Sequence, residues 1–465
     1  MEYNKGLRFK FQLPPSISEE NTYLDIKLNA IDEQTQKSHI VEAHKVIIKL
    51  YIPFIADFFK ESGSVFSDEQ NGVVTFNVPN LNAFIYLMDI LYRRENKKLY
   101  NWKLELEILK IINKFGIEID ILSVFENISV PPEGFDKLME IINLFMLDKN
   151  IKAQIVIRNI LPDIMNANIL SIKDKITEAF SYPSIICQTD VKEVKIINMF
   201  YNEKTIYDEC CVESLSADKT GKFYVLSVID EKKKKKLLIY YSNGYKFNEI
   251  ELQKQNGVYM AIMSSLDNYI AYESHIYDFN GKIIATLGKI NKGKFSYDDH
   301  YFCYKSRIKN KLFILDLTTN DTNEITVENE IFDFDLSSTN ILAISTKSKI
   351  KFYDLTTFQL EDEIDYEYVV SMSWFPYENI LAMSDEEQII IYDYNNSLPY
   401  YFKISCDKIQ YSYDKNYLLL FVYLEEQDTN EVALYEISSG RTLKAFECSK
   451  FDIINRNKII QELNV

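Results

Sequence analysis

Two histidines near the N-terminal end of the chain could in principle bind a metal ion. His39 and His44 are five residues apart, close to the end of the β-prone run 38–41. Imidazole is a common metal ligand, but a histidine at a corner between a strand and a helix more often has a structural role. We therefore predict no metal site and interpret His44 as a structural residue. The four histidines of the chain are His39, His44, His275 and His300.

The acidic and nucleophilic residues form no catalytic motif. The sequence contains no G-x-S-x-G, no Gly-rich phosphate loop and no H-E-x-x-H. The acid pairs Asp298–Asp299 and Glu425–Glu426 lie in presumed turns, where acidic side chains are usually solvated. We predict no catalytic residue and no cofactor-binding residue, and we do not expect an enzyme.

A run of five lysines, Lys232–Lys236, could form a basic patch for nucleic acid or nuclear import. The run lies between two β-prone segments, which is typical of a hairpin tip. The formal net charge of the chain is −17, and such a chain is repelled by phosphate backbones. We therefore favour the hairpin tip and predict no nucleic-acid binding.

The cysteines and the apolar residues indicate where the protein resides. There is no C-x-x-C, which favours reduced thiols in an intracellular protein. The N-terminus has no apolar core of a signal peptide, and no run of ~18 apolar residues suggests a membrane span. We expect a soluble cytoplasmic protein without membrane contact. The six cysteines are Cys187, Cys210, Cys211, Cys303, Cys406 and Cys448.

The elements around His44 follow from the stretch 43–62. From Pro53 onward, large apolar residues fall at helical spacing, and proline suits the first position of a helix. Two short helices should therefore meet at a corner, fed by a strand at 38–41. Flanking strands are predicted at 7–11, 23–28 and 73–79, and a polar loop is predicted at 63–72. Two further helices are predicted, 81–92 with Asn80 as its N-cap and 104–115 closed by Gly116.

These elements resemble the BTB/POZ family in order and in motifs. The matching residues are Asp25 before the first core strand, His44-Lys45, the corner at Pro53 with Ile52 in place of the usual serine, Ile90-Leu91-Tyr92, and the run Ile112 to Ile117. The resemblance implies an α+β BTB domain over 21–125, preceded by an N-terminal strand and loop over 1–20.

The BTB resemblance also implies partners. Relatives dimerise, and many dock a cullin scaffold through a hydrophobic-x-Glu motif after the helical corner. The nearest match here is Phe66-Ser67-Asp68, which is displaced by a longer loop and carries Asp instead of Glu. The partner-binding candidates are Phe59, Phe66, Ser67 and Asp68. The segment 126–185, with helices near 135–146, 152–159 and 171–180, resembles a shortened form of the helical region (BACK-like) that follows BTB domains in adaptors.

The second half of the chain, 186–465, repeats a strand that ends in Tyr-Asp or Leu-Asp. The last residues of these pairs and their variants stand at 198, 241, 278, 316, 354, 393 and 436, so the spacing is 37 to 43 residues. That period is typical of a four-stranded propeller blade, and the repeats resemble the WD-repeat family without its Gly-His dipeptide. We predict an all-β, seven-bladed propeller. Its composite closing blade should be made from both ends of this region, with 194–200 and 205–207 from its start and 451–454 and 458–463 from its C-terminal end.

The domain order resembles the BTB and WD-repeat proteins of giant (mimivirus-type) DNA viruses of amoebae. We therefore expect a non-enzymatic adaptor, in which the BTB domain dimerises and docks a host cullin ubiquitin ligase while the propeller binds a protein target. The alternative is a structural or assembly scaffold dimer without a ubiquitin ligase link. An enzyme with a propeller lid is a third and weaker hypothesis, because no nucleophile motif exists.

Overall fold

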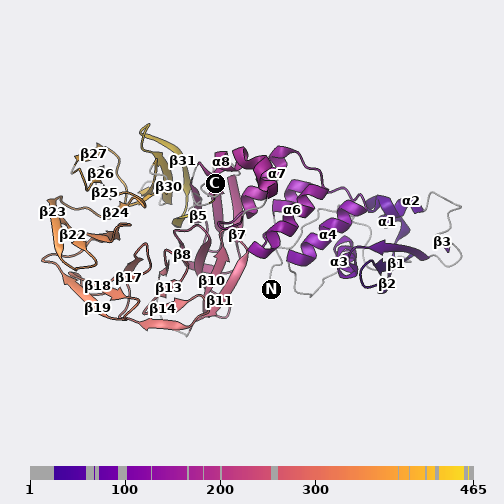
Figure 1. Cartoon of the computed structure of the whole chain (residues 1–465), viewed down its shortest axis with the longest axis horizontal. Coiled ribbons are helices and arrows are strands. Elements are labelled where there is room, and N and C mark those ends of the chain that lie inside the picture. The colour runs from indigo at the N-terminus through magenta and orange to yellow at the C-terminus, as the bar shows by residue number, and fades with distance from the viewer. Residues whose placement is uncertain are drawn as a thin grey trace. The chain divides into compact units, whose positions relative to one another are not determined.

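The computed structural model describes the chain in two compact units (Figure 1). The first unit comprises residues 1–160 and 166–172, and the second comprises 161–165 and 173–465. The described residues are 26–58, 67–68, 73–92, 102–126, 128–164, 167–181, 183–198, 202–252, 260–385, 387–396, 398–413, 416–424, 429–454 and 459. The predicted strand 7–11, the residue Asp25, and the partner candidates Phe59 and Phe66 lie outside them.

The first unit contains a mixed four-stranded sheet in the order β2-β1-β4-β3. β1 pairs antiparallel with β2 and parallel with β4. Side chains alternate between the core and solvent along β1, as its period-two pattern requires. The predicted strand 23–28 overlaps β1, which continues to Asp32, and residues 23–25 lie outside the described residues. The bounds are β1 (Ile26–Asp32), β2 (Ser38–Ala43), β3 (Ser67–Asp68) and β4 (Val73–Val78).

Asp32 joins the first hairpin turn to the start of a helix. Its carboxylate accepts the backbone N–H groups of Thr35 at 2.7 Å and Leu81 at 2.9 Å. These backbone donors hold the pKa of Asp32 below its usual value. One acidic residue therefore fixes the β1–β2 turn and orients the helix that begins at Leu81.

Helices complete the first unit, and their starts and ends follow the expected local rules. Pro53 is the first residue of α2, the side chain of Asn80 accepts the N–H of Ala83 at 3.0 Å, and Gly116 beyond α4 has a φ of +63°. The helical corner and the helices near 81–92 and 104–115 are confirmed. The helices are α1 (Lys45–Tyr51), α2 (Pro53–Phe58), α3 (Leu81–Leu91), α4 (Trp102–Lys114), α5 (Ile121–Glu126), η1 (Pro132–Gly134), α6 (Phe135–Leu144), α7 (Lys149–Asn159) and η2 (Ala167–Ile172).

An aromatic cluster forms the core between sheet and helices. The ring of Phe115 stacks on Phe54 at 5.1 Å between centroids and meets Phe76 edge-on at 5.6 Å. Phe76 in turn meets Phe84 edge-on at 5.3 Å. Because these rings come from β4, α2, α3 and the end of α4, they hold the helical corner against the sheet.

The second unit begins with α8 (Lys173–Phe180) and continues as seven four-stranded antiparallel sheets. Six of these sheets are built from consecutive strands. Their strands are β8 (Cys211–Ala217), β9 (Phe223–Ile229), β10 (Lys235–Tyr241), β11 (Lys246–Glu251); β12 (Ala261–Met263), β13 (Tyr269–Tyr272), β14 (His275–Asp278), β15 (Ile283–Thr286); β16 (Lys292–Phe295), β17 (Tyr301–Lys305), β18 (Lys311–Asp316), β19 (Thr322–Thr326); β20 (Asp333–Leu336), β21 (Ile341–Ser345), β22 (Lys349–Asp354), β23 (Leu360–Asp365); β24 (Ser371–Trp374), β25 (Ile380–Ser384), β26 (Ile389–Asp393), β27 (Leu398–Phe402); and β28 (Lys408–Tyr411), β29 (Tyr417–Leu424), β30 (Thr429–Glu436), β31 (Arg441–Glu447).

The seventh sheet combines strands from both ends of this region. Its order is β32-β5-β6-β7, so the C-terminal strand β32 takes the place that the first strand has in the other sheets. The strands are β32 (Lys450–Ile454), β5 (Ser184–Gln188), β6 (Val194–Asn198) and β7 (Asn202–Tyr207). The predicted strand 451–454 is present as β32. β5 supplies the second strand of the sheet, which was not predicted, and apart from Ile459 the predicted strand 458–463 lies outside the described residues.

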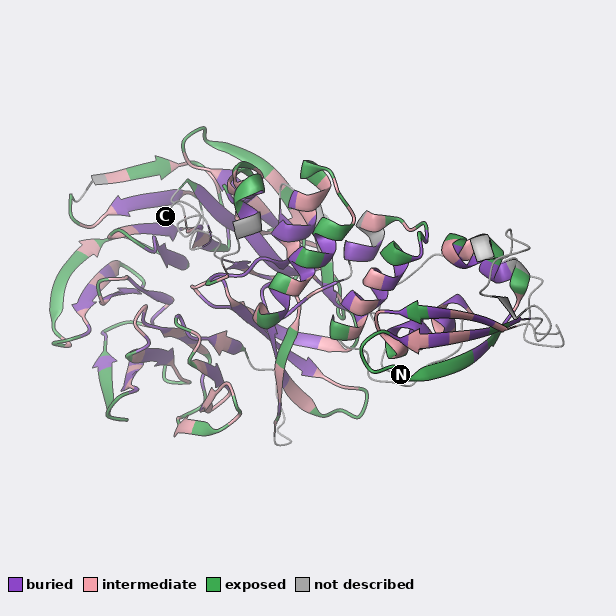
Figure 2. Cartoon of the chain, turned by 45° about the vertical axis from the view of Figure 1, so that its right-hand side comes forward, coloured by how far each residue is buried: buried purple, intermediate pink, exposed green. Residues whose placement is uncertain are grey.

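Exposed residues gather on the outer strands of the propeller (Figure 2), as the sheet β20-β21-β22-β23 illustrates. All four residues of β20 are buried, whereas β23, the outermost strand of the same sheet, is exposed at five of six positions. The first strands therefore lie at the centre of the ring, and the outermost strands form its rim.

The repeated aspartate at the end of the third strand caps the turn that follows. Asp316 accepts the backbone N–H groups of Thr318 at 2.8 Å and Thr319 at 3.1 Å, and Asp354 accepts that of Thr356 at 2.6 Å. Side chains of this length readily close such turns by bonding to the backbone two or three residues on. The repeat seen in the sequence thus marks the turn between the third and fourth strands.

Candidate interaction surfaces

His44 stands at the start of α1 and is held by a tyrosine. Its backbone N–H donates to the hydroxyl of Tyr92 at 2.7 Å, and its ring stacks on the same tyrosine at 5.7 Å between centroids. Both ring nitrogens are buried without a hydrogen-bond partner. His39 lies exposed on β2, and the described part of the chain contains no cluster of three metal-ligating side chains. The geometry of His44 supports the structural interpretation.

The predicted cullin-docking residues are only partly described. Phe59 and Phe66 lie outside the described residues, so the structure does not place them. The backbones of Ser67 and Asp68 form β3, paired with Val74 and Val73 at the edge of the sheet. The expectation that 63–72 is entirely loop is therefore wrong, because these two residues extend the sheet.

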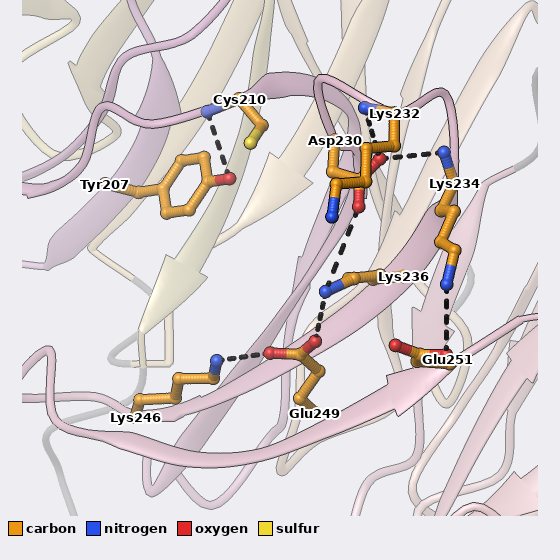
Figure 3. A network of polar contacts seen from close by, with 9 residues as sticks. All are labelled: Tyr207, Cys210, Asp230, Lys232, Lys234, Lys236, Lys246, Glu249 and Glu251. Atoms are coloured by element: carbon orange, nitrogen blue, oxygen red, sulfur yellow. Dashed lines mark hydrogen bonds and ion pairs between the residues drawn. The ribbon is translucent and has the colours of Figure 1, made fainter. Parts of the chain in front are cut away.

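The lysine run lies at and beyond a hairpin tip, as predicted (Figure 3). The carboxylate of Asp230 accepts the backbone N–H groups of Lys232 at 2.9 Å and Lys234 at 2.8 Å, which closes the turn between β9 and β10. Carboxylates neutralise much of the run's charge. The ion pairs are Lys234–Glu251 at 3.8 Å, Lys235–Glu213 at 3.0 Å and Lys236–Glu249 at 2.5 Å.

All six cysteines are free thiols. The backbone N–H of Cys210 donates to the hydroxyl of Tyr207 at 3.1 Å, which fixes the chain just before β8 (Figure 3). Burial raises the pKa of the Cys406 thiol to about 11 and that of Cys448 to about 12. A thiol with a raised pKa is a poor nucleophile, so these two cysteines are packing residues.

Two aspartates of β20 link three consecutive sheets at the centre of the ring. Asp333 accepts the N–H of Met372 on β24 at 2.9 Å and forms an ion pair with Lys292 on β16. Asp335 repeats this arrangement, accepting the N–H of Trp374 at 2.8 Å and pairing with Lys294 at 2.9 Å. Each carboxylate thus joins the sheet before its own to the sheet after it.

Serines and one further aspartate make the same kind of link elsewhere in the ring. The acceptor is always a side chain of a first strand, and the donor is a backbone N–H of the next first strand. These bonds are Ala261 to Ser214 at 2.8 Å, Met263 to Ser216 at 3.2 Å, Ile409 to Ser371 at 3.1 Å, Tyr411 to Ser373 at 3.0 Å and Ala217 to Asp452 at 2.8 Å.

These linking residues were not singled out from the sequence, although a signal exists. Polar residues alternate at the start of the repeats, as in Ser214-x-Ser216, Asp333-x-Asp335 and Ser371-x-Ser373. The alternation places both side chains on one face of a first strand, directed at the next sheet.

An α/β unit with helices followed by seven four-stranded antiparallel sheets defines a BTB-type unit joined to a seven-bladed propeller. The predicted fold class is confirmed. No protein-family model matches the chain. Sequence comparison shows distant homology to BTB/POZ proteins of Acanthamoeba polyphaga mimivirus, among them a BTB/POZ domain and WD-repeat protein.

The BTB/POZ and WD-repeat protein is 29% identical over 57% of this chain and 55% of its own length. Two BTB/POZ domain-containing proteins of the same virus are 29% and 28% identical over 43% and 34% of this chain, which correspond to 25% and 58% of their lengths. The chain therefore matches only a quarter to somewhat over half of these relatives.

Solved structures that resemble the chain do so at low sequence identity. A mitotic checkpoint complex chain matches 53% of this chain and 81% of its own length, with a TM-score of 0.43 and 14% identity. The dihydro-heme d1 dehydrogenase NirN matches 59% of this chain and 66% of its own, also with a TM-score of 0.43 and 14% identity. Separately, none of the helices that the structure describes is long and apolar enough to cross a membrane.

Proposed function

We propose that the protein is a non-enzymatic adaptor in the host cytoplasm, with one unit for assembly and one for target binding. The BTB unit dimerises and offers the segment after α2, which holds the candidates Phe59, Phe66, Ser67 and Asp68, to a cullin scaffold of a host ubiquitin ligase, while the propeller binds a protein target. The observation that carries the proposal is the architecture, a BTB-type unit followed by a seven-bladed propeller. Propellers present rigid loops and strand edges to partners.

Two exposed aliphatic residues on the first unit support dimerisation. Leu50 on α1 is 65% exposed and Ile40 on β2 is 54% exposed. Exposed aliphatic side chains mark a protein contact where they form one patch, so Leu50 and Ile40 are separate candidate contact residues. A second copy of the chain would remove them from water.

Light scattering of the full chain tests the dimer. Leu50→Lys should produce a monomer, because a charge at a buried interface costs several kcal/mol of association energy. The matched control is Leu144→Lys on α6, which changes another exposed leucine of the same unit, 43% exposed. A dimer that survives Leu50→Lys, or that is lost equally in the control, would argue against this interface.

Cullin docking has its own test. Full-length protein should retain a cullin from an amoebal extract, and Phe59→Ala and Phe66→Ala should reduce the amount retained while the dimer persists. If neither change alters the cullin signal, or if no cullin is retained, the ligase part of the proposal is wrong.

The scaffold dimer without a ligase link is the second candidate, favoured by one specific observation. The docking motif carries Asp68 where relatives carry Glu, and the backbones of Ser67 and Asp68 pair with β4. The scaffold predicts a stable dimer and a co-purified target without any cullin. Mass spectrometry of affinity-purified material separates the two candidates.

A further inference from the structure

Three lysines from three different sheets gather around the axis of the propeller. Lys219 follows β8, Lys294 lies on β16 and Lys408 lies on β28. The first strands of a propeller surround its central channel. The side chain of Lys294 is 37% exposed and Lys408 is exposed, so solvent reaches both lysines on these inner strands. We call Lys219, Lys294 and Lys408 the axial lysines.

A contact between two sheets that are not neighbours shows that Lys219 reaches the axis. Its ammonium group lies 3.4 Å from the centre of the Tyr297 ring, and Tyr297 follows β16. Strand β12 lies between β8 and β16 and contacts both of them. The side chains of Lys219 and Tyr297 therefore meet on the axial side of β12.

Hydrogen bonds between first strands place Lys408 and Lys219 at different depths along the axis. These strands run in the same direction, as the paired bonds between β20 and β24 show. Gln410, two residues after Lys408, donates to Asp452 at 2.7 Å, and Asp452 accepts the N–H of Ala217 at 2.8 Å. Lys219 is two residues beyond Ala217. The level of Asp452 thus lies between the two lysines.

The carboxylates near the axial lysines already have partners. Asp335 pairs with Lys294 at 2.9 Å and also accepts a backbone N–H of β24. Asp452 accepts two backbone N–H groups and one side-chain amide. Lys408 forms no ion pair with any residue that the structure describes, and its ammonium group lies 4.6 Å from the centre of the Phe451 ring. Lys408 therefore brings a positive charge to the axis that no carboxylate matches directly.

The axial lysines are costly to charge together. Burial lowers the pKa of Lys219 to about 7, and the charge of Lys294 adds to this effect while Asp335 opposes it. Burial also lowers the pKa of Lys408, and Lys294 again contributes while Asp452 opposes the shift. An anion among these ammonium groups would favour their charged forms. The charged groups that face Lys219 are Asp335, Lys294, Asp299 and Asp452.

We propose that the central channel of the propeller binds the phosphate chain of an oligophosphate, with the axial lysines along its length. The chain belongs to a free polyphosphate or to a nucleotide. Phosphate groups present acceptor oxygens in several directions, which suits ammonium groups that come from three sheets. Several linked phosphates suit lysines at different depths. The proposal goes beyond the adaptor role and does not depend on it.

The charge of the whole chain favours a small anion over an acidic protein segment. The net charge of −17 repels an acidic polypeptide over a broad surface. A small anion inside the channel interacts mainly with the groups around it, because charges beyond about 8 Å are largely screened at physiological salt.

Isothermal titration calorimetry of the full chain, without magnesium, tests the ligand class. Affinity should increase from inorganic phosphate to diphosphate and to tripolyphosphate, and citrate should bind less tightly than diphosphate. Adenosine triphosphate that binds more tightly than tripolyphosphate identifies a nucleotide as the source of the chain, and weaker binding identifies free polyphosphate. No binding of tripolyphosphate, or equally tight binding of a glutamate-rich peptide, overturns the proposal.

Lysine variants locate the site. Lys408→Gln should weaken tripolyphosphate binding about tenfold, the effect of losing one hydrogen bond to a charged group, and Lys408→Arg should retain most of it. The matched control is Lys234→Gln at the β9–β10 turn, which removes the same charge from a side chain that is 58% exposed. Unchanged melting temperatures show that the variants fold. Equal affinities for Lys408→Gln and Lys234→Gln contradict the site.

The pH dependence of binding tests Lys219 separately. Lys219→Arg keeps a positive charge at every pH used, because the guanidinium group is not deprotonated in proteins. Wild type must take up a proton on binding above pH 7, so its affinity should fall up to about tenfold relative to Lys219→Arg between pH 7 and pH 9. The ligand's own titration affects both proteins equally. A ratio of affinities that stays constant over this range overturns the assignment of Lys219.

Discussion

Asp333 connects its own sheet to the two neighbouring sheets, and it is only 2% exposed. It accepts a backbone N–H from β24, pairs with Lys292 of β16, and belongs to β20. Removing such a group leaves an amine and a buried N–H without an acceptor, which costs more than the bond itself contributes. The centre of the ring should therefore be sensitive to single substitutions there.

Asp333→Ala should lower the free energy of unfolding of the propeller by about 3 kcal/mol, and Asp333→Asn by about half of that, because the amide oxygen can still accept the N–H. The measurement is urea unfolding of the full chain followed by Trp374 fluorescence in a Trp102→Phe background. Asp321→Ala, at an exposed aspartate of a turn, is the control. If the Asp321→Ala and Asp333→Ala variants lost similar amounts of unfolding free energy, the cross-sheet bonds would contribute no more to stability than an exposed turn aspartate does.

Asp316 and Asp354 should make the propeller sensitive to acid. Bonds from the hydroxyl and N–H groups of Thr318 and Thr356 lower the pKa of the two carboxyl groups below the usual value of about 3.8. A lowered folded-state pKa stabilises the protein above the unfolded-state pKa, and this stabilisation is lost as pH falls through the folded-state value.

The Asp316→Asn, Asp354→Asn double variant should therefore be less stable than wild type at pH 7, and the difference should shrink between pH 5 and pH 3. Thermal unfolding at a series of pH values measures this. A difference that stays constant across that range would exclude the carboxylates as its source.

β32 closes the ring of the propeller. It is the inner strand of a sheet whose other three strands, β5, β6 and β7, come from the start of the propeller. It buries Phe451, Ile453 and Ile454, all at most 5% exposed. Its pairing with β5 satisfies an edge that would otherwise be open, and open edges promote aggregation.

A chain that ends at Ser449 should lose roughly 10 °C or more in the melting temperature of the propeller, since burying each large apolar side chain contributes roughly 2 kcal/mol. A chain that ends at Ile460 retains all of β32 and serves as the control. Melting curves and resistance to protease compare the two. Equal melting temperatures would mean that closure by β32 is dispensable.

Local chemistry made much of this fold predictable. The helix ends could be predicted from Pro53, Asn80 and Gly116, because each of these residues acts on the helical turn next to it. The blades could be predicted from the recurring aspartates, because each aspartate caps the β-turn that follows it. β5 was missed because its inner partner β32 is far away in sequence, with Gln188 and Lys450 separated by 262 residues. Tyr366 and Tyr401 come together only through the packing of two sheets, which no local pattern records.

The division into two units is not a simple cut in the chain. Leu161 is fully buried and belongs to the cluster of Phe223 and Val225 in the second unit, whereas its neighbour Ile160 belongs to the first unit. The boundary between 185 and 186 that the composition suggests stays a prediction, and the residues around 160 provide a direct way to examine it.

Leu161→Ala should destabilise the propeller by about 3 kcal/mol, the usual cost of a cavity at a buried leucine. Trp374 fluorescence in the Trp102→Phe background should report this loss. Trp102 fluorescence in a Trp374→Phe background should not. Ile160→Ala should give the reverse pattern, and a shift of both reporters by either change would show that the two units unfold together.

The position of β32 also has a consequence for how the protein folds during its synthesis on the ribosome. Gln188 cannot pair with Lys450 until a further 262 residues have been synthesised. This takes roughly 10–50 s at typical rates of synthesis. Throughout that interval the BTB unit is complete, but the ring is a curved stack with an unpaired strand at one end. The protein is therefore most exposed to chaperones and to unwanted strand pairing during translation, and the emergence of β32 ends that period.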